Sequence, residues 1–527
     1  RLQPRRLFDD AFPDPRYLAI NDPAWTAGAF QGLMAASVDT EGHPHNPYSI
    51  QVCLQPGTAY MVRRKDTKAL SALLEALAKH QPRLTYHSAL HERPMFRALA
   101  VAAGREDLIP RLDTVPFDDT MIMAYLLQNE PQGLKPLSVR ECGMRMQSYM
   151  EILEEPANTV AVEWLTNILA IENIEWEHRR ELAFWREINK GRKITVTPKL
   201  PKTDLHKSAE RCLRSKRPRG LWDDQVIDRQ VDAYRVLGDM PEATLDLVDP
   251  KVATHYGCRD ADATERVKPH LWNKIIGMGL EKTYQLELAT YPLIDRMHTI
   301  GFKPDLGHMA AFSDQLAFHV ADLQIELEQL VGIEGWNANS GDQVEDYLFN
   351  TLHLPGGKRT STGRHSTNKK ILEGLEKEFG ADYPVISKIL EYRQTYKLKN
   401  TFVDRLPDFV NRFPYDGRVH ATFRTTRVVT GRLAASDPNL LAQPKHGKFA
   451  KDFRRGWIAD PGHVLCSWDQ SQVELRVLAD LSQDPALLRA FREGLDLHAQ
   501  LAVKIFGGTE DDHKKGKGRL AAKAINF

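Results

Sequence analysis

The sequence feature that most constrains the fold is the stretch 464–506, VLCSWDQSQVELRVLADLSQDPALLRAFREGLDLHAQLAVKIF. An apolar run that opens at Val464 and Leu465 and reaches a polar turn at Asp469 predicts a buried strand ending in a carboxylate. Apolar side chains then follow at helical spacing, at Val473, Val477, Leu478 and Leu481. A strand fixes the position of an acid at its end, which suits a metal ligand. A lone aspartate there is more often a helix cap or part of a solvated turn.

Length and composition bound the class of protein. A chain of 527 residues exceeds one domain, and about two to four domains are expected. Hydrophobic content of 42% and charged content of 27% are typical of soluble proteins, and no apolar run is long enough to cross a bilayer, so we expect no membrane partner. The net charge of +1 still permits a nucleic-acid enzyme, because carboxylates at metal sites offset basic grooves.

The cysteines indicate a reducing compartment. The five cysteines are scattered and form no CxxC pair, which argues against structural zinc and a disulfide framework. We therefore expect a cytoplasmic location, in a bacterial cell or a phage-infected host, with an organelle as the alternative.

Three short motifs occur in order in the C-terminal part of the chain. They are Asp469-Gln-Ser-Gln-Val-Glu474-Leu-Arg, Gly494-Leu-Asp-Leu-His498 and Arg519-x-x-x-Lys523-x-x-x-Phe527. Their order and spacing resemble the family A DNA polymerases, the bacterial DNA polymerase I type with its phage relatives. The resemblance implies a right-hand polymerase with a thumb, a palm and the start of the fingers. The insertion at 157–223, described below, and the altered continuation of the family pattern at 437–444 favour a phage-type protein.

The resemblance implies a role for each residue of these motifs. Asp469 and the backbone carbonyl of Gln470 are expected to hold two Mg²⁺ ions, for which Mn²⁺ can substitute, beside the primer 3′-OH and a dNTP. Glu474 matches the position that excludes a ribose 2′-OH. The residues expected to contact the nucleotide are His498, Arg519, Lys523 and Phe527. The family's second catalytic aspartate does not occur before Phe527, so we expect the sequence to be a fragment that does not polymerise DNA as written.

The N-terminal third has the pattern of an α/β domain. Strands are predicted at 33–39, 48–54 and 59–63, and a helix at 67–80. Asp39 and Glu41 lie two apart at the end of the first strand, so both face one side. Tyr256 and Asp260 share one face of a predicted helix because they are four residues apart. An Asp-x-Glu pair alone occurs more often in a surface turn.

These acids and the tyrosine resemble the proofreading 3′–5′ exonuclease domain of the same polymerase family. The resemblance implies a ribonuclease H-like domain in which four carboxylates bind two metal ions and Tyr256 orients the attacking water. The carboxylates are Asp39, Glu41, Glu92 and Asp260.

The second exonuclease motif departs from the family pattern. Ser88 stands where the family has Asn, and Glu92 stands where it has Asp. Glutamate binds metal but reaches one methylene further, and small misplacements are costly in catalysis. A structural relic domain is therefore the alternative to an active nuclease. Residues 133–135 also match the family, where their usual role is packing.

An insertion, about residues 157–223, separates the second and third exonuclease motifs. Its first half has a helical pattern, and residues 190–219 are rich in lysine and arginine. This basic run suits a solvated loop, or electrostatic contact with DNA phosphates or with an acidic partner.

From residue 280 the pattern turns helical. Helices are predicted at 280–301, 306–330, 342–352 and 384–406, a mobile loop at 355–367 and a strand at 420–429. This order resembles the family's thumb, which grips the duplex along its minor groove. The residues expected to contact DNA are Lys358, Arg359, Arg364, Arg393, Lys397, Arg432 and Asn439. Without the resemblance, these charges indicate only a solvated face.

The sequence therefore predicts a multidomain protein of mixed α/β and α+β class. The expected divisions are an N-terminal segment 1–30, an exonuclease-like domain 31–275, a thumb with the approach to the palm 276–410, and a palm with the start of the fingers 411–527. We expect a DNA-templated DNA polymerase with 3′–5′ proofreading, acting on primer–template DNA and dNTPs, with a processivity factor or a helicase as a further partner. Two alternatives stay open: a nuclease whose polymerase half only clamps DNA, and a catalytically inactive DNA-binding scaffold.

Overall fold

The computed structural model describes residues 15–527 apart from eleven gaps, at 129–130, 154–155, 157–243, 357–358, 361–362, 413–415, 445–446, 514–517, 519–520, 523–524 and 526–527. The predicted insertion 157–223, with its basic run 190–219, lies outside the described residues. The chain divides into two compact units, Arg1–Phe302 with Ala310–Ala450, and Lys303–Met309 with Lys451–Phe527.

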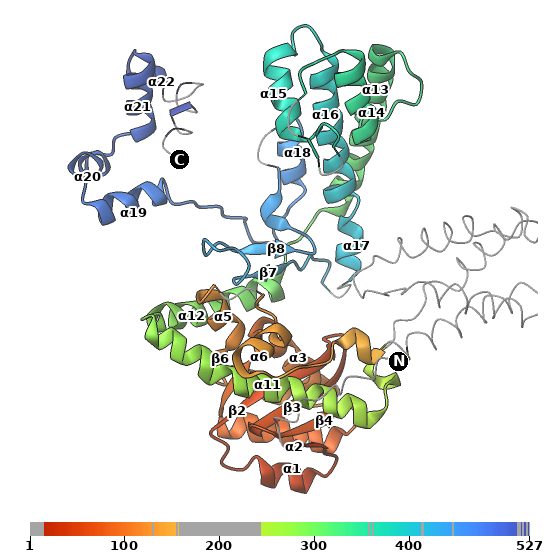
Figure 1. The fold of residues 1–527 in the computed structure, drawn as a ribbon, viewed down its shortest axis with the longest axis vertical. Coiled ribbons are helices and arrows are strands. Elements are labelled where there is room, and N and C mark those ends of the chain that lie inside the picture. The colour runs from red at the N-terminus through yellow and green to blue at the C-terminus, as the bar shows by residue number, and fades with distance from the viewer. Residues whose placement is uncertain are drawn as a thin grey trace, which may run out of the picture. The chain divides into compact units, whose positions relative to one another are not determined.

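A six-stranded mixed sheet forms the centre of the N-terminal part of the first unit (Figure 1). Its strand order is β1 (Arg16–Ala19), β4 (Thr58–Arg63), β3 (Asn46–Gln55), β2 (Ala35–His43), β5 (Arg83–Tyr86) and β6 (Phe117–Asp119). Strands β4, β3 and β2 are antiparallel, whereas β1, β5 and β6 each pair in parallel with their neighbour. The strands predicted at 33–39, 48–54 and 59–63 are confirmed as β2, β3 and β4.

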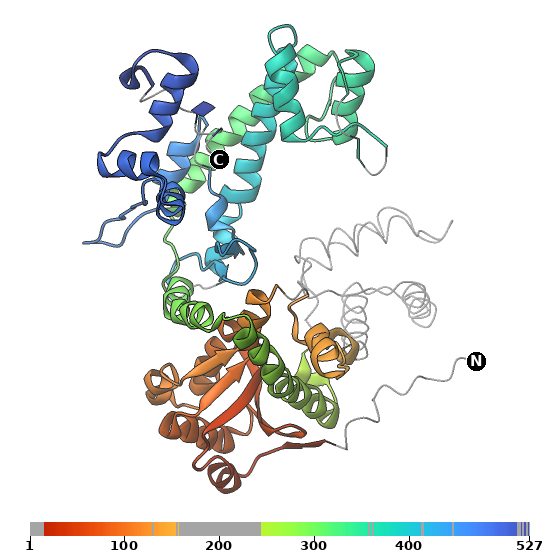
Figure 2. The same ribbon diagram turned by 60° about the vertical axis from the view of Figure 1, so that its left-hand side comes forward.

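The two faces of this sheet bury different side chains, because successive residues of a strand point to opposite sides. Val38 and Ile50 pack in one core with leucines of α2 (Thr67–His80), the helix predicted at these residues. Met61 belongs to a second core with apolar residues of α11 (Pro250–Gly277). Figure 1 and Figure 2 both show α11 crossing one face of the sheet. The sheet is thus covered by helices on both faces.

Further helices surround the sheet. They are α1 (Pro23–Ala29), α3 (Ala89–Ala102), α4 (Ile109–Leu112), α5 (Thr120–Leu126) and α6 (Leu134–Cys142), with 3₁₀ turns at Glu106–Leu108 and Leu245–Leu247. The start of α11 is defined by Asp249, whose carboxylate accepts hydrogen bonds from the N–H groups of Lys251 and Val252, with Pro250 at the first helical position.

The four helices predicted after residue 280 are present with shifted bounds, whereas the helix at 369–379 was not predicted. The structure has α12 (Glu281–Ile300), α13 (Leu306–Val331), α14 (Gly341–Glu345), a π-helical turn at Asp346–Thr351, α15 (Lys369–Phe379), α16 (Val385–Lys397) and α17 (Leu406–Asn411). The predicted helix 384–406 is divided, because a π-helical turn at Leu398–Val403 follows α16. Gly301 ends α12 with φ +64°, and a Cβ there would lie 2.8 Å from the carbonyl oxygen of Val419.

A two-stranded antiparallel sheet follows α17. It consists of β7 (Thr422–Arg424) and β8 (Ala434–Ser436), with a 3₁₀ turn at Leu440–Ala442. The strand predicted at 420–429 is therefore shorter than expected, since pairing extends over three residues only.

The C-terminal part of the chain is helical. It contains α18 (Ala450–Arg455), α19 (Val473–Ser482), α20 (Pro485–Arg492), α21 (Leu497–Phe506) and α22 (Glu510–His513). Within the second unit, Trp457 forms a β-bridge with Pro304, and Lys303 pairs with Asp460 at 2.9 Å. Among the helices that the structure describes, none combines the length and apolar character needed to cross a membrane.

The buried strand predicted to end at Asp469 is wrong. Residues 463–470 have no regular secondary structure, and Val464 and Trp468 are 81% and 83% exposed. A strand needs a neighbour to accept and donate its backbone hydrogen bonds, and none of the described residues forms strand pairs with this run. The helix expected next is present as α19, but its predicted apolar face, which includes Val477 and Leu481, is exposed.

Candidate functional site

Three carboxylates from two elements of the first unit converge at one point. Asp39 and Glu41 come from β2 and Asp260 from α11, and one ligand oxygen of each lies within 4.8 Å of the others. Across the described ranges, this is the only set of three His, Cys, Asp or Glu side chains with such spacing. The structure therefore brings together three of the four acids predicted for a metal centre.

The convergence depends on the close approach of α11 to the sheet. Asp39 alternates along β2 with Val38, which is buried in the core on the opposite face. Gly257 of α11 lies where a Cβ would come within 2.6 Å of the side-chain nitrogen of Gln51 on β3. Because glycine has no side chain there, α11 packs directly on the strands and carries Asp260 to the acids of β2.

Glu92, the fourth expected acid, lies beside this group on α3. Its Oε2 accepts a hydrogen bond of 2.6 Å from the hydroxyl of Thr40. Thr40 alternates with Asp39 and Glu41 along β2, so its side chain points to the opposite face of the strand. The bond from Thr40 therefore fixes Glu92 next to β2. The predicted role of Glu92 as a metal ligand stays a prediction.

The serine that replaces the expected asparagine precedes α3. Ser88 has φ +86°, a left-handed backbone that asparagine adopts more readily than serine. The carboxylate of Asp119 accepts hydrogen bonds from the backbone N–H groups of Ser88 (3.3 Å) and Ala89 (2.6 Å). These bonds hold the start of α3 in place. Glu92 on this helix is therefore positioned beside β2 although Ser88 replaces the asparagine expected from the family pattern.

A lysine that the sequence analysis assigned to packing takes part in the site. Lys135 of α6 lies with its Nζ 3.2 Å from Oδ2 of Asp260 and 3.3 Å from the hydroxyl of Tyr256. The same ammonium lies 4.6 Å from the centroid of the Tyr256 ring. The sequence gives little indication of this role, because Lys135 and Asp260 are far apart in the sequence although they are in contact in the structure.

Burial raises the pKa of every acid in the site, and repulsion by neighbouring carboxylates adds to the rise for Asp39, Glu41 and Glu92. Burial raises the pKa of Asp39 well above its ordinary value, and the other three carboxylates raise it further. Burial, followed by the charge of Asp260, raises the pKa of Glu41. Burial raises the pKa of Asp260 to about 6, with Lys135 opposing the shift, and that of Glu92 to about 8. A positive charge brought to the site would lower these pKa values and favour the ionised acids.

The donor set fits a divalent cation. Asp39 Oδ2 is buried and has no hydrogen-bond partner. Burial of an unpaired carboxylate oxygen costs free energy unless a positively charged group contacts it. The ligands are all oxygen atoms, which suit Mg²⁺ or Mn²⁺ better than softer metals. Burial also raises the pKa of Tyr256, so its hydroxyl stays protonated and available as a donor.

The residues expected at the polymerase centre lie in less enclosed surroundings. Asp469 and Gln470 are exposed within the irregular segment 463–470, and Glu474 is exposed in the first turn of α19. His498 is only 2% exposed at the start of α21. The remaining members, Arg519, Lys523 and Phe527, lie outside the described residues. Their arrangement around a nucleotide stays a prediction.

The residues expected to contact DNA have contacts of their own. Arg359 donates to the carbonyl of Gly363 at 2.7 Å, and Arg364 forms an ion pair with Asp342. Arg432 is exposed, and Asn439 accepts a hydrogen bond of 3.1 Å from the N–H of Leu441. Lys358 lies outside the described residues.

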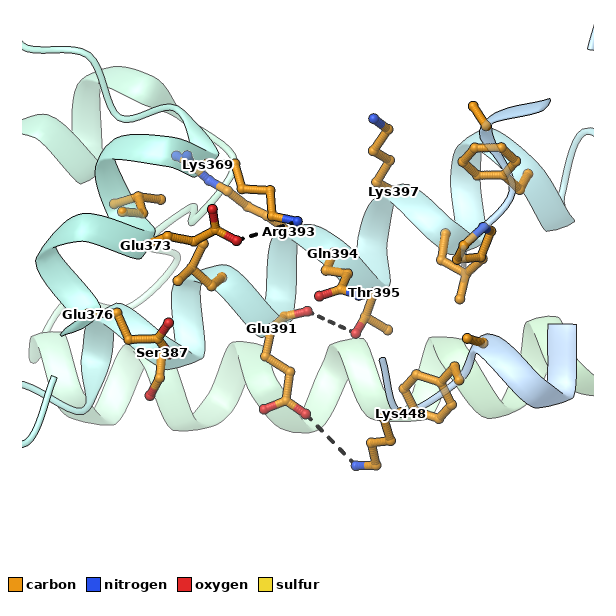
Figure 3. A pocket seen from close by; sticks show the side chains of 18 residues that line it. Lys369, Glu373, Glu376, Ser387, Glu391, Arg393, Gln394, Thr395, Lys397 and Lys448 are labelled. Atoms are coloured by element: carbon orange, nitrogen blue, oxygen red, sulfur yellow. Dashed lines mark hydrogen bonds and ion pairs between the residues drawn. The ribbon is translucent and has the colours of Figure 1, made fainter. Parts of the chain in front are cut away.

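Arg393 and Lys397 lie on α16 beside a cavity of about 860 Å³ (Figure 3). Arg393 donates to the carbonyl of Ala338 at 2.6 Å and to that of Thr367 at 2.5 Å, so its guanidinium joins loops to the helix. Figure 3 shows two ion pairs on the cavity wall, Lys369 with Glu373 at 3.6 Å and Lys448 with Glu391 at 3.8 Å. The wall thus carries charges of both signs.

Comparison with known sequences finds one family. The sequence profile of DNA polymerase family A matches residues 307–527. DNA polymerase I of Rhizobium leguminosarum is 39% identical over 285 residues, which are 54% of this chain and 27% of that relative. The thermostable DNA polymerase I of Thermus aquaticus is 37% identical over 306 residues, 55% of this chain and 36% of the relative. The chain thus spans a minor part of the length of these relatives.

Comparison with solved structures extends over more of the chain. The POL domain of Pol1 from M. smegmatis, in complex with DNA primer-template and dNTP, matches with a TM-score of 0.63. The match covers 97% of this chain and 70% of that chain at 20% sequence identity. At this identity the likeness concerns the fold alone.

Proposed function

We propose that the chain belongs to DNA polymerase family A, whose profile matches residues 307–527, and that the protein is a DNA-templated DNA polymerase that adds deoxynucleotides to a primer 3′ end. The family match is the observation that carries the proposal. The M. smegmatis polymerase domain of similar fold, solved with primer-template and dNTP, supports DNA and nucleotides as the partners.

Each motif residue has a role in this proposal. Asp469 and the carbonyl of Gln470 hold the divalent ions that polymerases of this family use. When bound, such ions lower the pKa of the primer hydroxyl and neutralise the triphosphate. Glu474 closes the space that a ribose 2′-OH would need. The groups proposed to hold the nucleotide are His498, Arg519, Lys523 and Phe527.

The proposed DNA contacts are electrostatic and independent of sequence. The basic residues that would meet phosphates are Lys358, Arg359, Arg364, Arg393 and Lys397 of the expected thumb at 276–410, and Arg432 of the expected palm, with Asn439 beside it. The expected processivity factor or helicase, the phage-type assignment and the cytoplasmic location stay predictions.

A primer-extension assay tests the polymerase proposal. A 5′-labelled primer on a longer template should lengthen when Mg²⁺ and dNTPs are added to the protein as purified. The matched control is Asp469→Ala, which should abolish extension and leave DNA affinity nearly unchanged. Extension that survives in Asp469→Ala would remove this residue from the metal site.

A second activity, 3′–5′ exonuclease, is favoured by the three-acid group in the N-terminal part. The mixed sheet with an antiparallel β2–β3–β4 core supports a ribonuclease H-like domain. We assign Asp39, Glu41 and Asp260 as divalent-ion ligands, with Glu92 as the fourth acid. Bound ions would supply an activated water and stabilise the leaving oxygen. Tyr256, as a protonated donor, would orient that water.

The exonuclease proposal has its own assay. A 5′-labelled single strand incubated with Mg²⁺ and without dNTPs should shorten from its 3′ end, and Asp260→Ala should stop the shortening. If the wild-type protein shortens DNA but never extends it, the nuclease with a DNA clamp is the better description. If DNA is bound with neither change in length, the scaffold alternative holds.

A further inference from the structure

Lys135 contacts the acid group without belonging to any motif assigned a chemical role. Its side chain is 31% exposed, whereas that of Asp260 is 13% exposed, so the ammonium reaches the acid from the more open side. It lies 3.2 Å from Asp260 Oδ2, 3.5 Å from Oδ1 and 3.3 Å from the Tyr256 hydroxyl. One ammonium thus bridges a proposed metal ligand and the proposed water-orienting group.

The electrostatics of the acid group require such a cation. Carboxylates that lie within 4.8 Å of one another repel strongly in partly buried surroundings. A lysine ammonium is a compact charge on a flexible stem, so it can pair with a carboxylate and later move away. It seeks the same carboxylate oxygen atoms that a divalent ion would bind.

We propose that Lys135 is the resident counter-cation and positioning residue of the nuclease centre, holding Tyr256 and competing with a divalent ion for Asp260. This inference rests on the proposed exonuclease function. Loss of the ammonium frees Asp260 and removes repulsion of the incoming ion, so the ion binds more tightly. Loss of the ammonium also removes one of the two hydrogen-bond contacts of the Tyr256 hydroxyl, the other being with Asp260, so hydrolysis slows. Opposite effects on ion affinity and on rate are the signature of this role.

The chain supplies a matched control on the same two helices. Lys274 of α11 pairs with Glu141 of α6 at 2.6 Å, as Lys135 of α6 pairs with Asp260 of α11 at 3.2 Å. Both lysines therefore join α6 to α11, but the acid group includes only the partner of Lys135. Substitution of Lys274 therefore measures how much the loss of one ion pair between α6 and α11 affects the protein, without a change at the acid group.

The experiment measures Mn²⁺ binding directly, by calorimetry and by electron paramagnetic resonance of the free ion, on the DNA-free full chain at pH 8. Every protein carries Asp469→Ala, so that ions at the polymerase centre do not contribute. Lys135→Met should bind Mn²⁺ about tenfold more tightly, because the ion no longer meets the repulsion of the ammonium. Lys135→Arg, which keeps the charge, should stay near the parent, and Lys274→Met should be unchanged. Single-strand hydrolysis at saturating Mn²⁺ should fall about tenfold in Lys135→Met only.

Other outcomes overturn the inference in distinguishable ways. If Lys135→Met binds Mn²⁺ as the parent does, or more weakly, Lys135 does not compete for Asp260. If Lys135→Met and Lys274→Met lose affinity and activity alike, the lysine is only a connection between helices. If Asp260→Ala binds as much Mn²⁺ as the parent does, no ion is bound at the acid group. The proposed metal centre is then wrong, and the proposed exonuclease function is wrong with it. Should Lys135→Met not fold, Lys135→Gln at the same position decides between these outcomes.

Discussion

The two candidate centres of this protein differ in how they are enclosed. In the N-terminal part, a packed sheet brings together acids that are far apart in sequence; Glu41 is 8% exposed, and Asp39 has a buried oxygen without a partner. In the C-terminal part, Asp469 and Glu474 are close in sequence but exposed. The segment that carries the family match therefore has the less enclosed acids. The family profile covers the exposed acids and not the enclosed ones, so similarity to this profile and enclosure are separate properties.

Reciprocal loss of activity would sharpen this comparison most. We expect Asp39→Ala to reduce 3′–5′ hydrolysis by at least about a hundredfold, since ligands matter more than the outer groups that cost 10–100-fold. Extension by the same variant should be unaffected. Asp469→Ala should have the reverse pattern, measured on one labelled primer with and without dNTPs. A variant that loses both activities would show that the two centres are not independent.

The enclosed centre should make stability depend on pH in the metal-free protein. The folded-state pKa values of Asp260 (about 6) and Glu92 (about 8) lie above their ordinary values of 3.8 and 4.5. Folding therefore favours the protonated acids, and this stability is complete below about pH 4 and is lost as pH rises through 6 and 8. We expect a loss on the order of a few kcal/mol between pH 5 and 9.

Hydrogen exchange of β2 and α11 peptides with EDTA present would measure this loss. Saturating Mg²⁺ should remove most of it, and Glu92→Gln should flatten the part near pH 8. Stability that is constant from pH 5 to 9 would contradict the raised pKa values.

A side chain added at Gly257 should destabilise the protein, because α11 packs closely on the sheet at this residue. Gly257→Ala places a methyl group within 2.6 Å of Gln51 and 2.9 Å of Met61, and we expect a loss of about 1–3 kcal/mol in unfolding free energy. Gly277→Ala is the control on the same helix, because nothing lies within 4 Å of its Cβ. Urea unfolding measures both, and equal stability of the two variants would mean that the helix moves without cost.

The smallest effect is expected at the exposed ion pair of the thumb-like part. Arg364→Ala removes the pairing with Asp342, and an exposed pair contributes less than about 1 kcal/mol. If Arg364 also meets a DNA phosphate, the slope of log affinity against log salt should fall by about one. Fluorescence anisotropy of a labelled primer–template across salt concentrations measures this slope. An unchanged slope would leave Arg364 as part of the protein surface only.

Local patterns in the sequence predicted much of the scaffold of the enclosed centre. The alternation of β2 placed Asp39 and Glu41 on one side, and helical spacing placed Tyr256 and Asp260 on one face of α11. These predictions depend on neighbours in sequence, which the periodicity of a strand or helix reports directly.

Features that depend on tertiary contacts were not predicted. Lys135 joins the site because α6 packs against α11, and no local pattern records that contact. The run 464–469 has the composition of a buried strand, but burial requires a partner strand, and the described residues provide none. The hydrogen bond from Thr40 to Glu92 likewise follows from the position of α3 beside β2.

Strand β2 carries core residues and proposed ligands in strict alternation, with Val38 buried on one face and Asp39 on the other. A slip of its pairing by one residue would exchange the two sets. One inserted residue ahead of Val38 would therefore act as a loss of both β2 carboxylates at once, although neither is altered. Replacing one acid, in contrast, changes a single ligand. The proposed nuclease centre is thus more sensitive to the length of this strand than to its composition.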